Sequence, residues 1–513
     1  MKFSYRAIVR ILSIIIGASL LKLAFIATPE NHPNELSTQD IRQDLYVLLQ
    51  QLEQHSAFYA LDSQHSTKQL NHLAGLISEQ YQDSTPKERF AAELTKLLNS
   101  IKDPGSLVSN FKDESTEIPF ILRPLNAQWL ALDKNNSPLS AEFPFITHID
   151  GIPLNKWIST SQTYLSEPAK ESQEMQAVWL RKLNLLREDL GLSIKPYVLL
   201  TLSNDDLQTT QMTMALAHKA PSMPKDEPEE IDISFNHLMK KLNTLAPVKN
   251  HLSGNGLETI NRDTVMLKID DLYGFELNKN LQQTLLQGMT YPLLIIDLRE
   301  AKGFSPRLLT LLSRYQDIQP AENTGLSPWA EIMGFARYRR STEFRNDYLQ
   351  PLNFRPLDAL KLSSLRRQQL TNTLPEGDNR SFSPWYVRTK PDVAPEGTNR
   401  LAILVSAQCR QECEWIAYRT KNWSRVNLIG EKTSGDFARQ YHLTLPNSGL
   451  EVLFSSTLTY DAKGNLLSGK GTEPDIYLPQ NSDIEWQGLV SLVKTAAPKP
   501  IQPRVQPKFA FVD

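Results

Sequence analysis

The stretch that decides the fold covers residues 401–452 and reads LAILVSAQCRQECEWIAYRTKNWSRVNLIGEKTSGDFARQYHLTLPNSGLEV. It opens on an apolar run, passes through a polar turn into a segment with helical spacing, and continues into a second apolar run. A further short stretch, KGTEPDIYLP, occupies residues 470–479. Strands that alternate with helices in this way predict an α/β core.

Several short motifs in these stretches resemble those of the tail-specific, or carboxyl-terminal, protease family, also called interphotoreceptor-retinoid-binding-protein-like. In that family a strand leads into a TASASE-like turn and a helix, and GE-x-T-x-G and G-x-x-PD motifs follow. Glu414 matches the Glu of SASE, 430–435 matches GE-x-T-x-G, and 471–475 matches the closing motif. Upstream, PLLIIDLRE at 292–300 resembles the family's DLR strand. The resemblance covers most of 38–480.

The family resemblance implies an α/β (α+β multidomain) fold with a crotonase-like ββα protease core, a helical N-terminal region and a PDZ-like domain. We expect no intact catalytic dyad. The family's nucleophilic Ser lies three residues before the motif Glu, which here is Gln411, and its general-base Lys follows the last motif Gly, which here is Asp436. Their separation, 436 − 411 = 25 residues, is the family's own. Gln has no nucleophilic atom, and we expect the Asp beside a turn to be a solvated anion.

Three other positions extend this comparison. Gln440 falls on a Gln that orients the Lys in the family. Gly105, in IKDPGSLVS at 101–109, falls on the His of a D-G-H-T/S motif, although these residues also suit a plain DPGS turn. In the oxyanion region Gly303 matches one glycine, whereas Phe304 occupies the next, where a side chain is expected to crowd an oxyanion.

The two cysteines, Cys409 and Cys413, lie inside the altered motif. A local disulfide or an inert pair is the favoured interpretation for an oxidising compartment. The alternative is a reactive thiol that replaces the nucleophile, and we keep both cysteines as alternative nucleophiles. Other nearby groups that a divergent site would use are Ser406, Ser434 and Lys432.

Composition excludes several classes of partner. The chain has 513 residues, with 55 Lys and Arg against 57 Asp and Glu, so its net charge of −2 does not suggest nucleic acid as a partner. The nine His residues are scattered, without HExxH or CxxC spacing. We expect no metal and no cofactor.

The N-terminus predicts export. A basic segment, MKFSYRAIVR, precedes an apolar run at 11–27, which is typical of a secretory signal. Phe25 and Ala27 fit a cleavage site badly, so a membrane tether through 11–27 stays open. The expected location is periplasmic or extracytoplasmic, either soluble or N-terminally anchored.

The chain divides into segments of different character. An Arg-rich run at 337–345 within the insertion suits either a surface for an anionic or peptide partner or, as we favour, a solvated helix face and a cap over the core. The predicted segments are 1–30 (signal peptide or N-terminal anchor), 31–112 (helical), 113–218 (PDZ-like), 219–232 (linker), 233–480 (core, with an insertion at 319–399) and 481–513 (helix and Pro-rich tail).

Three functions remain open from the sequence. The first is an exported, catalytically degenerate relative of the tail-specific proteases that binds an envelope protein or peptide. The alternative is an active, divergent serine- or cysteine-type peptidase that cleaves protein C-termini. A third is a structural envelope protein in which only the Arg-rich insertion matters. A protein or peptide is the expected partner, and the oligomeric state is not predicted.

Overall fold

The described part of the chain carries a mixed α/β fold, as the sequence predicts. The predicted leader at 1–30, with the possible tether at 11–27, and the linker at 219–232 lie outside the described residues. Among the described residues, no helix is both long and apolar enough to span a bilayer. The computed structural model describes residues 33–81, 84–110, 118–125, 128–133, 135, 137–216, 256–316, 330–341, 349–352, 374–375, 380–391, 398–438, 440–478, 486–496 and 499.

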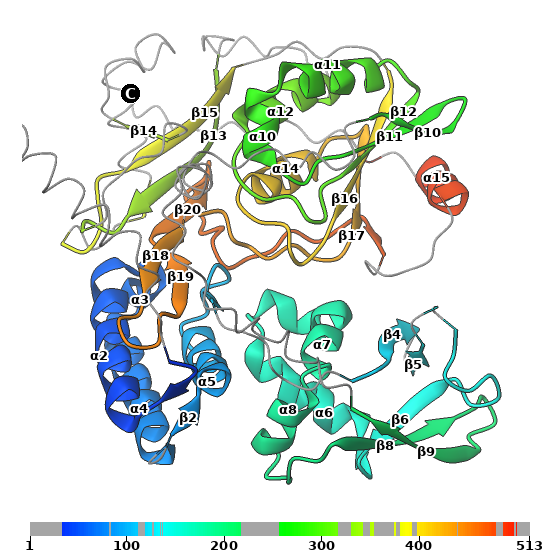
Figure 1. Ribbon diagram of the computed structural model, residues 1–513. Helices are drawn as coiled ribbons and strands as arrows, with labels where there is room; N and C mark the ends of the chain where they lie inside the picture. The colour runs from blue at the N-terminus through cyan, green and yellow to red at the C-terminus, as the bar shows by residue number, and fades with distance from the viewer. Residues whose placement is uncertain are drawn as a thin grey trace, which may run out of the picture.

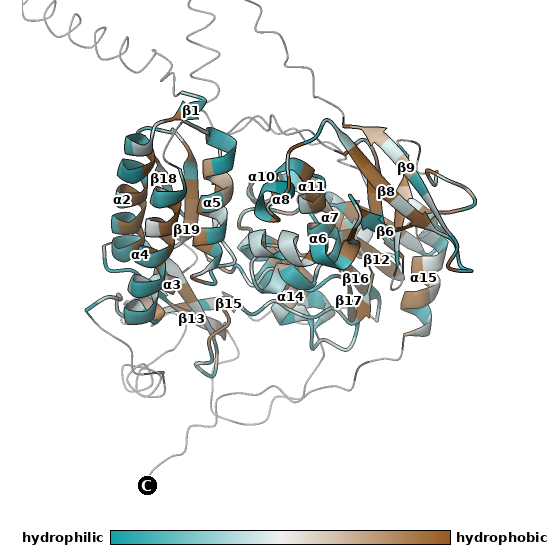
Figure 2. Cartoon of the chain, turned by 90° about the horizontal axis from the view of Figure 1, so that it is seen from below, coloured by the Kyte–Doolittle hydropathy of each residue, from teal (hydrophilic) through white to brown (hydrophobic). Residues whose placement is uncertain are grey.

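Helices occupy most of 38–99, as the apolar spacing predicts. The first begins at a capping box in which Ser37 and Asp40 each bind the other's backbone N–H. The apolar faces of these helices pack against a three-stranded sheet in the order β18-β19-β3 (Figure 2). Phe454 of this sheet is fully buried. The elements are α2 (Thr38–His55), α3 (Ala57–Leu61), α4 (Ser63–Gln80), α5 (Lys87–Asn99), β3 (Leu107–Ser109), β18 (Gln440–Thr444) and β19 (Glu451–Ser455), with a small pair of β1 (Glu35–Leu36) and β2 (Thr85–Pro86).

Residues 118–216, called the middle region below, form an antiparallel sheet in the order β4-β5-β6-β8-β9. Trp157 is fully buried under this sheet and donates its indole N–H to Ile149 O at 3.0 Å. The PDZ-like character of this region stays a prediction. The elements are β4 (Ile121–Leu125), β5 (Gln128–Leu132), β6 (Phe145–Ile149), β7 (Ile152–Pro153), α6 (Leu154–Ser161), α7 (Gln173–Leu180), α8 (Leu183–Asp189), β8 (Tyr197–Ser203) and β9 (Thr209–Ala215).

The core is a six-stranded sheet in the order β10-β11-β12-β16-β17-β21, parallel from β11 onward (Figure 1). Side chains of β11 and β12 alternate between a face under α10, α11, α12 and α14 and a face under α15. The elements are β10 (Glu258–Asn261), β11 (Thr264–Lys268), α10 (Leu272–Leu277), α11 (Lys279–Gly288), β12 (Leu293–Asp297), α12 (Pro306–Leu312), β16 (Arg400–Val405), α14 (Glu412–Thr420), β17 (Val426–Gly430), β21 (Ile476–Tyr477) and α15 (Trp486–Thr495).

The described part of the predicted insertion corrects the expectation of a solvated helix face. It forms strands that join β20 (Thr457–Asp461) in a sheet of order β14-β15-β13-β20, where β13 is Ala330–Tyr338, β14 is Gln350–Pro351 and β15 is Tyr386–Pro391. Arg337 is buried with its guanidinium over Trp385, and Arg339 is buried and donates to Gln54 O. Burial of both cations argues against an exposed anion-binding surface here. Arg345 lies outside the described residues.

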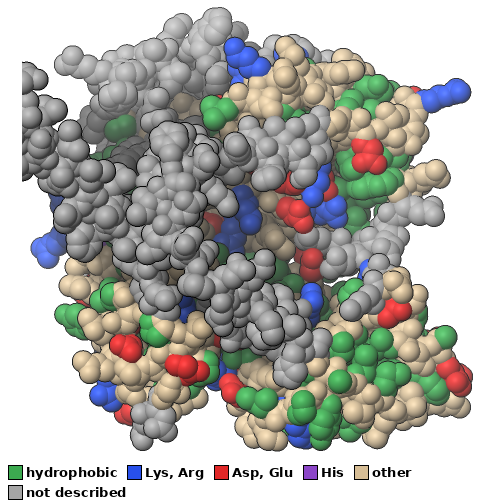
Figure 3. All heavy atoms as spheres, viewed as in Figure 1, with side chains coloured by type: hydrophobic (Ala, Val, Ile, Leu, Met, Phe, Trp, Pro, Cys, Tyr) green, Lys and Arg blue, Asp and Glu red, His purple; other side chains and the backbone are tan. Residues whose placement is uncertain are grey.

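Polar contacts attach the middle region to both of its neighbours. Asp189 accepts from Arg89 at 2.9 Å and from Lys96 at 2.7 Å, both on α5. On the core side, Ser172 donates to the buried Glu431 at 2.7 Å. Charged side chains of both signs gather along the boundary between the core and the middle region (Figure 3). The middle region is therefore held at two separate points.

Gly430 provides a test of the core sheet. Its φ is +133°, and a Cβ there would lie 1.8 Å from Val405 O on the neighbouring strand. We expect Gly430→Ala to lower the free energy of unfolding by more than about 3 kcal/mol, because neither backbone can yield. The control is Gly75→Ala on α4, where a Cβ meets nothing within 4 Å and where Ala should stabilise by about 1 kcal/mol. Urea unfolding measures the free energy of unfolding of both variants. Equal changes in the two variants would contradict the proposed clash at Gly430.

Candidate functional site

Gln411 lies at a strained turn between strand β16 of the core sheet and helix α14. It is the N-cap of this helix, with φ +57° and ψ −113°, a backbone conformation that non-glycine residues rarely adopt. Its N–H donates to Asp436 O at 2.6 Å, so the two predicted dyad positions are in direct backbone contact. Gln411 and Asp436, which are 25 residues apart in the sequence, therefore lie side by side in the structure. The strain is of the kind that is found at functional sites.

Glu414 connects this turn to the second motif. Its buried carboxylate accepts from Thr433 Oγ1 at 2.7 Å, from Ser434 Oγ at 3.1 Å and from the Gly435 N–H. Burial raises the pKa of Glu414 to about 8, although all three hydrogen bonds oppose that change. Glu414 thus ties the first turn of α14 to the loop that ends in Asp436.

Asp436 corrects the expectation of a solvated anion, because its side chain is buried. Oδ2 accepts from Gln440 Nε2 at 3.1 Å, and Oδ1 accepts from the Ala438 N–H at 3.2 Å. Burial raises its pKa to about 6; Arg410 opposes the change and the nearby Asp103 adds to it. An Asp at this position is therefore a buried acid with limited access to water.

Gly105 and Gln440 both lie beside the Asp436 side chain. Gln440 Nε2 also donates to Gly105 O at 2.7 Å. A Cβ on Gly105 would lie 2.5 Å from Ser455 Oγ and 3.0 Å from Asp436 Oδ1. The DPGS turn is present, since the Gly105 N–H donates to Asp103 Oδ1 at 2.9 Å, and Ser455 Oγ donates to the same atom at 2.7 Å. A larger side chain at position 105 would therefore require the Ser455 or Asp436 side chain to shift.

Gly303 lies on the other side of the Gln411 turn. Its carbonyl accepts the Glu412 N–H at 3.1 Å, and its φ is +100°. A Cβ there would lie 2.5 Å from Tyr273 Cδ2. Phe304 is buried and packs edge-on against the Tyr273 ring, with 6.2 Å between ring centroids. Gly303 thus reaches the turn, whereas crowding of an oxyanion by Phe304 stays a prediction.

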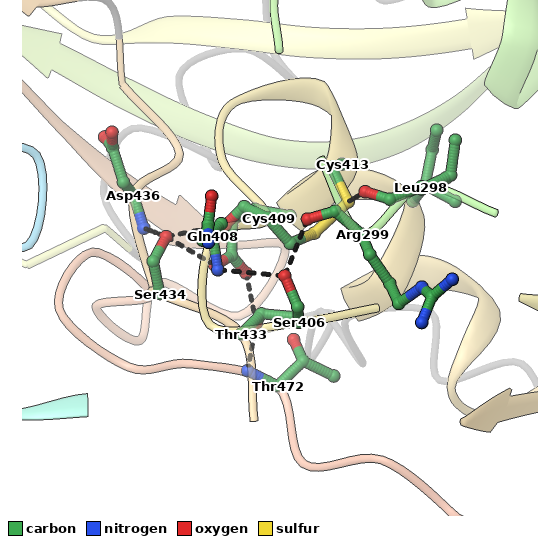
Figure 4. The surroundings of a disulfide bond; sticks show 12 residues. Leu298, Arg299, Ser406, Gln408, Cys409, Cys413, Thr433, Ser434, Asp436 and Thr472 are labelled. Carbon is green, nitrogen blue, oxygen red and sulfur yellow. Dashed lines mark hydrogen bonds between the residues drawn. A yellow bond between two sulfur atoms is a disulfide. The ribbon is translucent and has the colours of Figure 1, made fainter. Parts of the chain in front are cut away.

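The cysteines form the expected local disulfide, and their Cα atoms are 5.4 Å apart (Figure 4). Both side chains are fully buried. Among the described residues no free cysteine remains. A thiolate is the nucleophilic form of cysteine, so Cys409 and Cys413 are not alternative nucleophiles in this oxidised state. The covalent bridge instead encloses Gln411.

The other candidate groups also have structural partners. Ser406 Oγ donates to Arg299 O at 2.6 Å, and Ser434 Oγ donates to Cys409 O at 2.6 Å (Figure 4). Lys432 pairs with Glu473 at 2.9 Å, and this contact raises its pKa, the opposite of what a general base needs. These residues do not supply a substitute for the Ser–Lys dyad. Among the described residues, no group of three or more His, Cys, Asp and Glu is arranged to hold a metal.

A buried ion pair beside the turn was missed by sequence reasoning. Glu412, the residue after Gln411, accepts from Arg388 Nη2 on β15 at 2.7 Å through both carboxylate oxygens. The Arg388 guanidinium also lies 4.8 Å from the Trp415 ring centroid. Burial raises the pKa of Glu412, against the effect of Arg388. None of the motifs in the sequence predicts the Glu412–Arg388 ion pair, because Arg388 lies in the region that was predicted only as an insertion.

Comparisons with known proteins agree with this geometry. Residues 345–478 match the model of peptidase family S41. This match supports the predicted resemblance to the tail-specific, or S41, peptidases. No curated protein matches it.

Solved structures of CPAF resemble this chain over most of its length. Mature CPAF has a TM-score of 0.53 at 13% identity, with 89% of this chain and 96% of that chain covered. Its complex with lactacystin has a TM-score of 0.52 at 14% identity, with 89% and 97% covered. A CPAF mutant has a TM-score of 0.54 at 14% identity, with 91% and 99% covered. At this identity the likeness shows the fold alone.

Titration of Asp436 gives a testable pH dependence. Its folded pKa of about 6 lies above the ordinary 3.8, so the folded chain binds this proton more tightly than the unfolded chain. The resulting stability is fully present below about pH 4 and is lost as the pH rises through about 6. We expect Asp436→Asn to gain up to about 3 kcal/mol relative to wild type between pH 4 and pH 7.5, at about 1.4 kcal/mol for each pKa unit.

Denaturant unfolding at several pH values measures this difference. Asp205→Asn, on the exposed β8–β9 hairpin, controls for the loss of one negative charge. Parallel curves for wild type and Asp436→Asn would show that Asp436 does not titrate in this range.

The disulfide predicts the reactivity of the cysteines. Because both sulfurs are bonded and buried, N-ethylmaleimide should add nothing to the chain, whether native or unfolded without reductant. After unfolding and reduction it should add two groups, measured by intact mass. A single adduct on the unreduced chain would reveal a free thiol and restore the cysteine alternative.

Proposed function

We propose that this chain is an exported S41 family member that has lost acyl-transfer catalysis and acts by binding an envelope protein or peptide. The observation that carries the proposal is the state of Asp436. An S41 dyad needs a desolvated amine that can take a hydroxyl proton. Here a buried carboxyl lies at the predicted base position, and both of its oxygens accept hydrogen bonds from Gln440 and Ala438. The predicted nucleophile position carries an amide.

Close packing around the site supports loss of chemistry rather than a shift of register. Gly105, Asp436 and Gln440 converge through direct hydrogen bonds and close contacts, although they come from separate motifs. A side chain at position 105, such as the family's His, would require the Ser455 and Asp436 side chains to shift. A misalignment of one motif would not bring all of these positions into one cluster.

The disulfide supports export. Such bonds form and persist in oxidising compartments and are rare in the cytosol. Cys409 and Cys413 bridge the Gln411 turn, so the site itself would depend on that environment. An N-terminal leader of the kind predicted at 1–30 would deliver the chain there. Whether the leader is cleaved or remains as a tether does not affect the proposed binding site.

The retained fold supports a polypeptide as the ligand. Peptidases of the S41 family act on proteins or peptides, and in this chain the turn at Gln411 is strained. Glu414 and the disulfide both hold that turn in place. A rigid turn without a nucleophilic side chain suits recognition of a polypeptide that is not cut.

A cleavage assay tests the proposal. Reduced, carboxymethylated α-lactalbumin is mixed with purified full-length chain, and fragments are followed by mass spectrometry. We expect no cleavage but measurable binding, because neither Gln411 nor Asp436 can form and resolve an acyl-enzyme. The variant with Gln411→Ser and Asp436→Lys should cleave slowly, since the nearby Asp103 carboxyl opposes loss of the lysine proton.

The two single substitutions serve as matched controls and should be inactive. Cleavage by the wild-type chain would favour the alternative, a divergent peptidase that acts on protein C-termini. Because Cys409 and Cys413 are bridged, labelling would then be expected on a serine.

A further inference from the structure

Arg410 is a partly buried cation at the candidate site. It directly precedes Gln411 in the turn between β16 and α14. Within the described part of the chain, its guanidinium has neither a hydrogen-bond partner nor an ion-pair partner. A guanidinium carries several N–H donors in a planar fork, and partly buried donors of this kind favour an acceptor. The donors of Arg410 are therefore available to a ligand.

Other arginines near the site differ from Arg410, because the fold itself provides their acceptors. Arg388 pairs with Glu412 at 2.7 Å, and both side chains are almost completely buried. Arg299 pairs with Asp297, also at 2.7 Å. These two guanidiniums hold segments of the protein together. Arg410 has no such structural contact, so a role in the fold does not account for its charge.

The backbone of Arg410 is held in a fixed place beside the turn. Its carbonyl accepts the Cys413 N–H at 3.1 Å. The disulfide between Cys409 and Cys413 encloses Arg410 together with Gln411. The side chain of Arg410 therefore starts from a rigid point next to the predicted nucleophile position, and only its own rotatable bonds must be ordered when a ligand binds.

Two buried carboxyls, Asp103 and Asp436, attract the Arg410 side chain toward the site. Burial raises the pKa of both carboxyls, and the charge of Arg410 opposes that rise. Neither carboxyl accepts a hydrogen bond from Arg410, since their oxygens accept from backbone N–H groups and from the side chains of Ser455 and Gln440. The attraction thus acts at a distance and leaves the donors of the guanidinium unused.

We propose that Arg410 binds a carboxylate of the polypeptide held at the Gln411 turn. This inference rests on the proposed function, because that function supplies the polypeptide. The parallel N–H donors of a guanidinium match the two oxygens of a carboxylate, and such charge-assisted pairs are stronger than neutral hydrogen bonds. The carboxylate comes either from an acidic side chain or from a chain end. In both cases the site selects anionic segments over neutral ones.

Asp436 makes this selection depend on pH. Burial raises its pKa to about 6, whereas a ligand carboxylate with an ordinary pKa of about 4 stays ionised at pH 5.5. Protonation of Asp436 removes a negative charge that competes with the ligand for Arg410. Asp103 and Glu414 also face Asp436, and burial raises the pKa of each, so neither gains negative charge on acidification. The ligand carboxylate should therefore bind more tightly at pH 5.5 than at pH 7.5.

Three fluorescent 12-residue peptides test the site on the full-length chain. The first has a central Glu and a C-terminal amide, the second a central Gln and the amide, and the third a central Gln and a free C-terminal carboxylate. Fluorescence anisotropy measures their binding. Wild type should bind the first or the third about tenfold more tightly than the second, as a charge-assisted pair predicts. The tighter of the two identifies the source of the carboxylate, and its advantage should grow at pH 5.5.

Substitutions of Arg410 connect this preference to one side chain. Arg410→Gln should remove the preference and its pH dependence, whereas Arg410→Lys keeps the charge and should retain part of the preference. Arg42→Gln, at an exposed position on α2, controls for the loss of one positive charge and should bind like wild type. Thermal unfolding of each variant verifies that the fold is intact.

The outcomes separate this inference from the proposed function. Equal binding of all three peptides by wild type overturns the carboxylate site and leaves the binding function in place. An unchanged preference in Arg410→Gln, or an equal loss of affinity for all three peptides, does the same, because the first excludes Arg410 and the second indicates a purely structural role.

Carboxymethylated α-lactalbumin provides the remaining comparison. If it binds and none of the peptides does, the carboxylate site alone is overturned. If neither the protein nor any peptide binds, both proposals are overturned. Cleavage of the peptides by wild type overturns the degenerate function only, and the carboxylate site is then judged by whether Arg410→Gln removes the preference from kcat/KM.

Discussion

The hydrogen bonds of one buried carboxylate, Glu414, hold the candidate site together. Glu414 lies in the first turn of α14 and accepts from the side chains of Thr433 and Ser434 and from the Gly435 N–H. Those bonds draw a loop that is about twenty residues away in sequence onto the helix N-terminus. The contact between Gln411 N–H and Asp436 O follows from that docking. Removing Glu414 would leave the Thr433 hydroxyl and the Gly435 N–H without this acceptor, whereas Ser434 Oγ would keep its bond to Cys409 O.

Two buried acids lie close to this contact. Asp436 and Asp103 are both buried, and burial raises the pKa of each. Arg410 is the cation that opposes these shifts. Such a cluster disfavours loss of the proton from a lysine, so a lysine introduced at position 436 is expected to be a weak base.

Sequence reasoning succeeded where short motifs carry physical constraints. The motifs placed Gln411, Asp436, Gln440 and Gly105 at separate points of the sequence, and in the structure these residues lie together. It failed for burial, since an Asp beside a turn was expected to be solvated but is buried, with its oxygens bonded to Gln440 and Ala438. It also failed for the Arg-rich run, where Arg337 is buried on β13 and stacked on Trp385.

The sequence by itself determined the mixed α/β class, the S41 resemblance and the residues at each motif position, because strand periodicity, glycine placement and motif spacing are local properties. Only the tertiary structure decided the environment of those residues. The Glu412–Arg388 pair, the occupied space at Gly105 and the exposed Tyr273 over Gly303 each join segments far apart in the chain. Solvent exclusion and ionisation depend on such distant neighbours, and a local stretch of sequence does not show which residues these neighbours are.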